Sequence, residues 1–71
     1  MSDTIYKKVE IIGTSSVSIE DAIARGVAAA APTDDEHHTD WFEVQEIRGA
    51  VRNGKVDQYQ VVLKLGLRLK A

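Results

Sequence analysis

Hydrophobic and polar residues alternate most regularly near the end of the chain. Every second residue there is apolar or aromatic: Tyr59, Val61, Leu63, Leu65, Leu67 and Leu69. A period of two predicts a β-strand with one apolar face, which we place at Lys55–Leu69. The Asn53-Gly54 pair before it is a strong signal for a two-residue hairpin turn. The sequence therefore predicts a long hairpin, with its other strand at Trp41–Arg52.

A helix is predicted between this hairpin and a first strand at Tyr6–Gly13. Ser18 provides a hydroxyl cap, and acidic residues follow it at the positive end of the helix. Apolar residues recur four positions apart and form one stripe: Ile19, Ile23 and Val27. Pro32 is expected to end the helix near Ala31. The predicted fold class is α+β, in the order β-α-β-β, with a three-stranded antiparallel sheet wrapped on one helix.

The two-residue turn also sets the register of the hairpin. It places Trp41 opposite Gly66 and Glu43 opposite Lys64 on the face away from the helix. The pairs expected on the helix side are Phe42 with Leu65 and Val44 with Leu63. A glycine inside a strand often marks the close approach of a large group. Trp41 with an empty position beside it is therefore a plausible platform for a planar ligand.

Glu46 and Arg48 do not fit this register. A regular hairpin places both charged residues on the core side of the sheet. Either a β-bulge near Gln45–Ile47 turns them to the other face, or the helix is too short to cover that end of the sheet. The sequence leaves both explanations open.

Composition restricts the classes of function. The chain has 71 residues, 44% hydrophobic residues, a net charge of −2 and no cysteine. A chain this short rarely builds a sufficient core alone, and without disulfides we expect oligomerisation to stabilise it. The charge gives no footprint for nucleic acid or an anionic membrane, and no segment has the length of a membrane span. We expect a cytoplasmic protein, because the N-terminus lacks a signal-peptide pattern.

Candidate chemistry outside the hairpin is weak. The segment Thr33–Asp40 is predicted as a polar connection, and its acidic residues with His37 and His38 are a possible cluster for a divalent metal. Adjacent residues rarely converge on one ion, so we interpret the segment as a solvated loop and expect no metal site. No pattern of a nucleophile with its base, and no phosphate-binding loop, occurs in the chain.

The chain resembles the dodecin family over nearly its whole length. Four segments occur in the family's order and spacing: Ile12-Gly13-Thr14-Ser15, Asp40-Trp41-Phe42-Glu43-Val44, Ile47-Arg48-Gly49, and Tyr59-Gln60-Val61 continuing to Gly66-Leu67-Arg68-Leu69. The resemblance implies that residues 1–71 form a single dodecin-like domain that assembles into a hollow homododecamer. It also implies non-catalytic binding of FMN or riboflavin for storage, buffering and photoprotection. Coenzyme A is a secondary expectation, because some bacterial members carry it.

The resemblance also implies roles for individual residues. Trp41 would stack on the flavin ring, and Gln60 would bond the ring edge. Glu46 and Arg48 would hold the ribityl chain, and Arg68 would assist near the phosphate or at a subunit contact. Without the resemblance, Trp41 would be interpreted as an aromatic residue at the edge of the core and the others as solvated strand residues.

Two alternatives remain open. The first is a dodecin-like assembly protein whose pocket is lost or altered, because the segment between Ala28 and Asp40 is more polar than in the family's pattern. The second is a flavin-dependent enzyme. The sequence disfavours it, because no acid–base pair or substrate cavity is evident in so short a chain.

Overall fold

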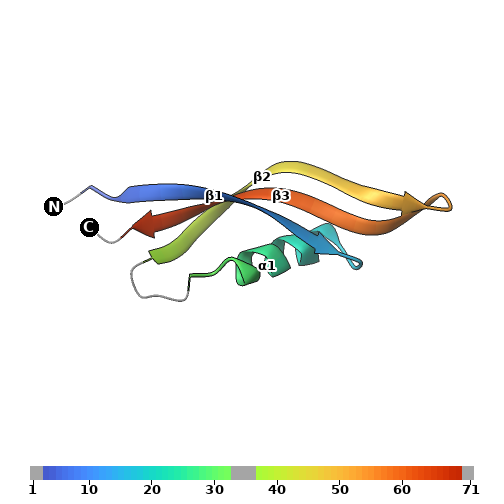
Figure 1. The fold of residues 1–71 in the computed structure, drawn as a ribbon, viewed down its shortest axis with the longest axis horizontal. Helices are drawn as coiled ribbons and strands as arrows, with labels where there is room; N and C mark the ends of the chain where they lie inside the picture. The colour runs from blue at the N-terminus through green and yellow to red at the C-terminus, as the bar shows by residue number, and fades with distance from the viewer. Residues whose placement is uncertain (1–2, 33–36, 70–71) are drawn as a thin grey trace.

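The computed structural model describes residues 3–32 and 37–69. Its elements are β1 (Ile5–Ser15), α1 (Ile19–Ala29), β2 (His37–Arg52) and β3 (Lys55–Leu69). The strands form an antiparallel sheet in the order β1-β3-β2, with α1 packed on one face (Figure 1). The predicted β-α-β-β order and the three-stranded antiparallel sheet are confirmed. The turn is confirmed as well, because Asn53 and Gly54 both have positive φ, at 52° and 74°, as a type I′ hairpin requires.

Three predicted boundaries differ from the structure. β1 runs on to Ser15, because β3 continues far enough to pair with it at Tyr59. α1 ends at Ala29, slightly earlier than predicted from Pro32. The prediction of a connection over Thr33–Asp40 is wrong for residues 37–40, which are the first residues of β2. Their polarity does not prevent strand formation, because the end of β3 offers free backbone partners, while residues 33–36 lie outside the described part of the chain.

Two serines fix the junction between β1 and α1. The Ser18 hydroxyl caps the helix by accepting a hydrogen bond from the backbone N–H of Asp21 at 2.9 Å, as predicted. Ser15, which is buried, donates from its hydroxyl to the Asp21 carboxylate at 2.6 Å and accepts from the backbone N–H of Val17 at 2.9 Å. The helix start is thereby tied to the end of β1, which holds α1 across the sheet.

The core lies between α1 and the central strand. The buried cluster consists of Ala22, Val61, Leu63, Leu65 and Leu67, and the predicted helical stripe of Ile19, Ile23 and Val27 packs against it. The helix approaches β1 so closely that a Cβ at Gly13 would collide with the carbonyl oxygen of Ala22. Glycine is therefore required at this position by the contact between helix and strand.

The helix covers β1 and β3 but leaves the same side of β2 open. Phe42, Val44 and Ile47 lie on this side and are 49%, 40% and 56% exposed. We call these three residues the apolar strip. Figure 1 shows the tip of the hairpin formed by β2 and β3 extending past the N-terminal end of α1. The apolar strip is a surface that this chain does not cover by itself.

Two β-bulges of opposite sense decide which side chains of β2 share a face. The register shifts between Val44 and Glu46, where β2 carries the extra residue Gln45. It shifts back between Ala50 and Val51, where the extra residue lies on β3. The first bulge is the one that the sequence left open as an explanation, and it turns Glu46 and Arg48 away from the helix. A third shift between Thr39 and Trp41 makes Asp40 an extra residue of β2.

The molecule is elongated for its length. It measures 56 × 20 × 14 Å and has a radius of gyration of 14.6 Å. A compact chain of this length would have a radius of gyration of about 11 Å. No helix among the described residues is long and apolar enough to cross a membrane. The shape supports the expectation that further burial comes from other copies of the chain.

Gly13→Ala and Gly26→Ala should differ sharply in stability. At Gly13 the new methyl group meets backbone, so we expect an overpacking cost of about 1–3 kcal/mol. At Gly26 it meets methyl carbons of Leu63 and Ile11 at 3.2 and 3.3 Å, which can shift, and the Gly13 Cα at 3.3 Å. These mild contacts offset part of the gain of about 1 kcal/mol in helix propensity, so we expect a small net change. Thermal and chemical unfolding measure both. Equal destabilisation by the two variants would contradict this view of the helix–strand contact.

Candidate functional site

The face of the sheet away from α1 carries most of the polar side chains of interest. We call it the open face. It consists of Tyr6, Lys8, Glu10, Ile12 and Thr14 on β1, Gln58, Gln60, Val62, Lys64, Gly66 and Arg68 on β3, and Trp41, Glu43, Glu46 and Arg48 on β2. All five residues predicted to bind a ligand are on this face. They form two groups, one near each end of β3.

The first group is centred on Trp41. The predicted pairing of Trp41 with Gly66 is confirmed. A Cβ at Gly66 would overlap with three atoms of the indole ring, Cδ2, Cε2 and Cζ2. The ring therefore lies against the backbone of the central strand, in the space that the glycine leaves. Trp41 remains partly exposed in this position, and the Lys8 nitrogen lies over the ring, 5.6 Å from its centroid.

Polar contacts from both edge strands border the indole. Lys8 on β1 forms an ion pair with Glu43 on β2, with 2.7 Å between Nζ and Oε1. Near the other end of the ring, the Tyr6 hydroxyl donates to Asp40 at 3.4 Å, and Arg68 Nε lies 3.4 Å from the same carboxylate oxygen. Both sets of contacts span the central strand. They place equal numbers of positive and negative charges around Trp41.

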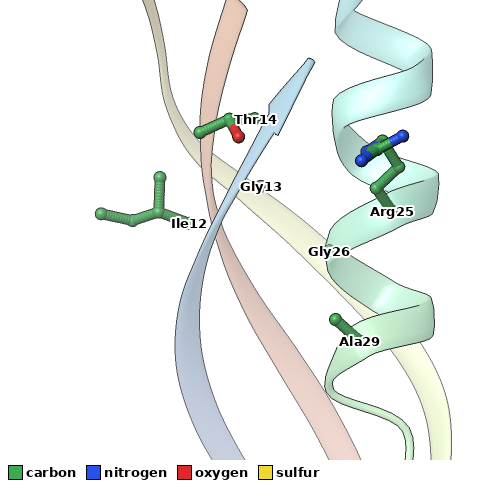
Figure 2. Close-up of a pocket in the computed structure, with 6 residues that line it drawn as sticks. All are labelled: Ile12, Gly13, Thr14, Arg25, Gly26 and Ala29. Carbon is green, nitrogen blue, oxygen red and sulfur yellow. The ribbon is translucent and has the colours of Figure 1, made fainter.

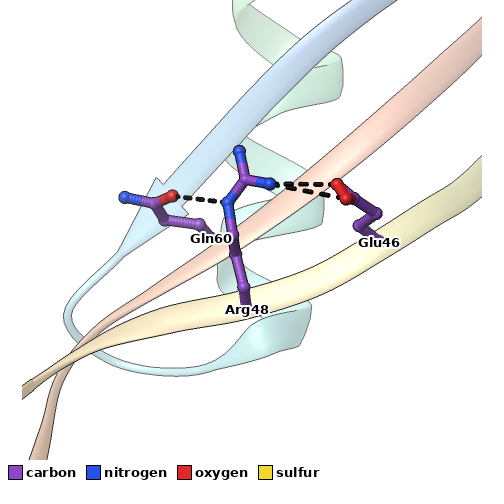
Figure 3. A network of polar contacts seen from close by, with 3 residues as sticks. All are labelled: Glu46, Arg48 and Gln60. Carbon is purple, nitrogen blue, oxygen red and sulfur yellow. Dashed lines mark hydrogen bonds and ion pairs between the residues drawn. The ribbon is translucent and has the colours of Figure 1, made fainter.

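The second group is a chain of polar contacts on β2 and β3. Arg48 donates from Nη1 to Glu46 Oε1 at 2.9 Å and from Nε to Gln60 Oε1 at 3.2 Å. Figure 3 shows the guanidinium of Arg48 between the other two side chains. Gln60 in turn donates from Nε2 to Gln58 Oε1 at 3.1 Å. The Gln60 amide thus donates one hydrogen bond and accepts one within the protein.

The two groups lie well apart within one chain. Gln60 and Gly66 are six residues apart on β3, which corresponds to about 20 Å at the usual rise of a strand. The structure therefore brings Glu46, Arg48 and Gln60 together, and it places Arg68 beside the residues around Trp41. It does not bring Trp41 and Gln60 to one position in a single chain.

Sequence analysis missed three neighbours of the indole. Tyr6 and Lys8 approach it from β1, with ring centroids 6.1 Å apart for Tyr6 and the Lys8 nitrogen 5.6 Å from the ring centroid. Asp40 joins Tyr6 and Arg68. The pairing of β1 with β3 would have identified the first two, because Lys8 lies directly opposite Gly66, but no turn links these strands to set that register.

A shallow hollow lies between β1 and α1 and is a weaker candidate. Its volume is about 230 Å³, and Figure 2 shows the lining residues Ile12, Gly13, Thr14, Arg25, Gly26 and Ala29. Ligand sites usually combine a deeper cavity with several convergent polar groups. Here Thr14 and Arg25 supply the polar side chains, and both are exposed.

The predicted acidic and histidine-rich segment lies only partly within the structure. His37, His38 and Asp40 belong to β2, whereas Asp34, Asp35 and Glu36 lie outside the described residues. Over residues 3–32 and 37–69, no group of three or more His, Cys, Asp or Glu side chains is placed to hold a metal ion.

Comparisons with known proteins agree on one family. The model of the Dodecin family matches residues 5–70. The dodecin of Thermus thermophilus is 50% identical over 66 residues, which cover 93% of each chain. A crystal structure of a Thermus thermophilus protein has a TM-score of 0.86 at 48% identity and covers 97% of this chain and 98% of that one. The Streptomyces coelicolor dodecin has a TM-score of 0.85 at 39% identity, over 100% of this chain and 99% of that one.

Gly66→Ala should displace the indole of Trp41, because a tryptophan ring cannot yield as a flexible side chain would. We expect a changed tryptophan emission spectrum and a loss of about 1–3 kcal/mol of stability. A double-mutant cycle provides the control. In a Trp41→Ala background the same substitution should cost little, because the ring that it meets is gone. An equal cost in both backgrounds would show that the packing of Trp41 does not depend on Gly66.

Proposed function

The chain belongs to the dodecin family, and on this premise we propose that it is a non-catalytic flavin-binding protein that works as an oligomer. The observation that carries the proposal is the partly exposed indole of Trp41, seated on the Gly66 backbone. Offset stacking of aromatic rings adds roughly 0.5–1.5 kcal/mol beyond the burial of area. A flat, partly supported indole suits the isoalloxazine ring of FMN or riboflavin.

The separation of the two groups supports a site made from more than one chain. Trp41 and Gln60 are about 20 Å apart, farther than one flavin ring system reaches. We therefore assign the stacking surface to Trp41 of one chain and the edge contact to Gln60 of another. The Gln60 amide fits a flavin edge, because it provides both donor and acceptor, which it now shares with Arg48 and Gln58.

The charged residues fit the polar tail of the ligand. Glu46 and Arg48 are linked to Gln60 and would bind the ribityl chain beside it. Arg68 would assist near the phosphate of FMN or at a subunit contact, in competition with its present partner Asp40. A guanidinium suits phosphate oxygens because it presents paired donors. Coenzyme A remains a secondary candidate ligand on the same grounds.

The role that we propose is storage, buffering and photoprotection of flavin in the cytoplasm. An indole stacked on a bound flavin would shorten the excited state of that flavin by electron transfer. The acidic groups beside Trp41 are each engaged by a cation, Asp40 by Arg68 and Glu43 by Lys8. This pairing favours a binding role over acid–base catalysis. The net charge of −2 gives no support to a nucleic-acid partner.

Assembly follows from the surface that the chain leaves open. The apolar strip on β2 and the elongated shape both indicate burial against other copies of the chain. A homododecamer, as the family resemblance implies, would cover this surface and bring the two halves of the site together.

The proposal is tested by titrating riboflavin and FMN against the purified protein and following flavin fluorescence. We expect strong quenching with the wild type, loss of most of it with Trp41→Ala, and weaker binding with Gln60→Ala. A larger affinity for FMN than for riboflavin would show that the phosphate contributes. If the assembled protein quenches neither flavin, the result would contradict flavin binding and support the alternative of an assembly protein whose pocket is lost or altered. Turnover with a reductant and an electron acceptor would instead support the enzyme alternative.

Assembly is tested by Ile47→Asp, which places a charge at one end of the apolar strip, on its most exposed residue. We expect the wild type to have a mass twelve times that of the 7.8 kDa chain. The variant should shift to smaller species in native mass spectrometry and bind flavin poorly, because burying an unpaired charge is costly. Val17→Asp is the control, since Val17 is 73% exposed but lies in the turn before α1. A full-size Ile47→Asp assembly would show that the strip is not a subunit contact.

A further inference from the structure

The ion pair between Lys8 and Glu43 runs across the sheet beside Trp41. Lys8 and Trp41 are the two partners of Gly66, so the three residues form one row across the strands. From this row the Lys8 side chain reaches over the central strand to Glu43, two residues along from Trp41. Its nitrogen lies 5.6 Å from the centroid of the indole, within the range of a cation–π interaction.

The position of this pair is not explained by a contribution to folding. The two side chains are 51% and 45% exposed, and ion pairs at such positions contribute little to stability. The effect of the pair is instead local. Lys8 contacts the indole electrostatically, and Glu43 holds the Lys8 nitrogen at its place across the sheet.

The remaining neighbours of the ring do not fix it by themselves. Gly66 supports one face of the indole but has no side chain with which to limit its movement in the plane of the sheet. Tyr6 borders the ring with 6.1 Å between centroids and the ring planes tilted by 49°, an ordinary aromatic contact that limits the ring on the Tyr6 side only. Lys8, by contrast, is held in place by its short ion pair with Glu43, with 2.7 Å between Nζ and Oε1.

We propose that Lys8 and Glu43 are positioning residues that hold the indole of Trp41 in the orientation required for stacking. The proposal rests on the function proposed above for Trp41. A ring that is already oriented loses less conformational freedom when a ligand stacks on it, so binding is tighter. The pair therefore acts on ligand affinity through the indole and needs no contact with the ligand.

Lys8→Met and Glu43→Gln test this proposal in two measurements. The first uses the protein without ligand. Trp41 is the single tryptophan of the chain. The anisotropy of its selectively excited emission and the tryptophan bands of near-ultraviolet circular dichroism, at wavelengths longer than tyrosine absorbs, therefore report on this ring. We expect both variants to lose dichroism and anisotropy, with an unchanged unfolding midpoint and an unchanged assembly mass. Lys8→Arg should retain both signals, because arginine keeps the charge and also packs on aromatic faces.

The second measurement is the affinity for riboflavin. We expect each variant to bind about 3- to 10-fold more weakly. The double variant should bind riboflavin no more weakly than either single variant, because the two residues act as one unit. The matched control is the pair of Arg52 and Asp57 near the hairpin tip, with 3.7 Å between its charged atoms. Arg52→Met and Asp57→Asn should leave the tryptophan signals and the affinity unchanged.

Two results would overturn the proposal. Unchanged dichroism and anisotropy in Lys8→Met would show that the indole is oriented without the pair. Tighter riboflavin binding by Lys8→Met would show that Lys8 covers the face that the ligand needs. If the wild type binds no flavin, the proposed function fails, while the measurements without ligand still decide whether the pair orients Trp41.

Discussion

The length of α1 limits how much of the sheet this chain covers by itself. A helix of 11 residues spans about 16 Å, whereas β3, with 15 residues, spans about 50 Å. The helix therefore protects one stretch of β1 and β3, and the core is small. The part of the sheet beyond the helix is exposed in a single chain. The apolar strip on β2 is exposed as well, because it lies beside the covered stretch of β3, where the helix does not reach across the sheet. The elongated shape follows from the mismatch in length, and the limited cover from α1 is consistent with burial against other copies of the chain.

The sequence did not determine whether the hairpin contains the two β-bulges seen in the structure. The turn at Asn53-Gly54 and the extent of β3 were predictable from a tight turn and a period of two. The predicted pairing of Trp41 with Gly66 holds because the two bulges between the turn and Trp41 cancel one another. The position of Arg48 was not predictable. If the helix does not cover that end of the sheet, a charged residue is tolerated on the helix side, so the sequence is equally consistent with a regular hairpin and with a bulged one. The bulges place Glu46 and Arg48 on the same face of the sheet as Trp41 and Gln60.

The neighbourhood of Trp41 shows a second limit of sequence analysis. The glycine opposite the tryptophan was visible in the pattern, since the hairpin register relates the two. Tyr6 and Lys8 come from β1, which reaches β3 only after the chain has passed through α1 and β2. Such a register depends on how the helix packs, and packing contacts such as that of Gly13 on Ala22 are not readable from periodicity. Likewise, the start of β2 at His37 depends on free backbone partners at the end of β3 and not on the polarity of the segment.

The proposed function couples assembly to ligand binding through the geometry of one face. Within one chain the stacking surface and the amide of Gln60 are fixed on a rigid strand, so no side-chain rearrangement closes a gap of about 20 Å. A ligand that needs both must lie between chains. The same contacts that cover the exposed apolar surface would then set the distance between the two halves of the site. A ligand bound between chains in turn adds stability to the assembled state by mass action, so a change at the interface should alter binding without touching any residue of the site.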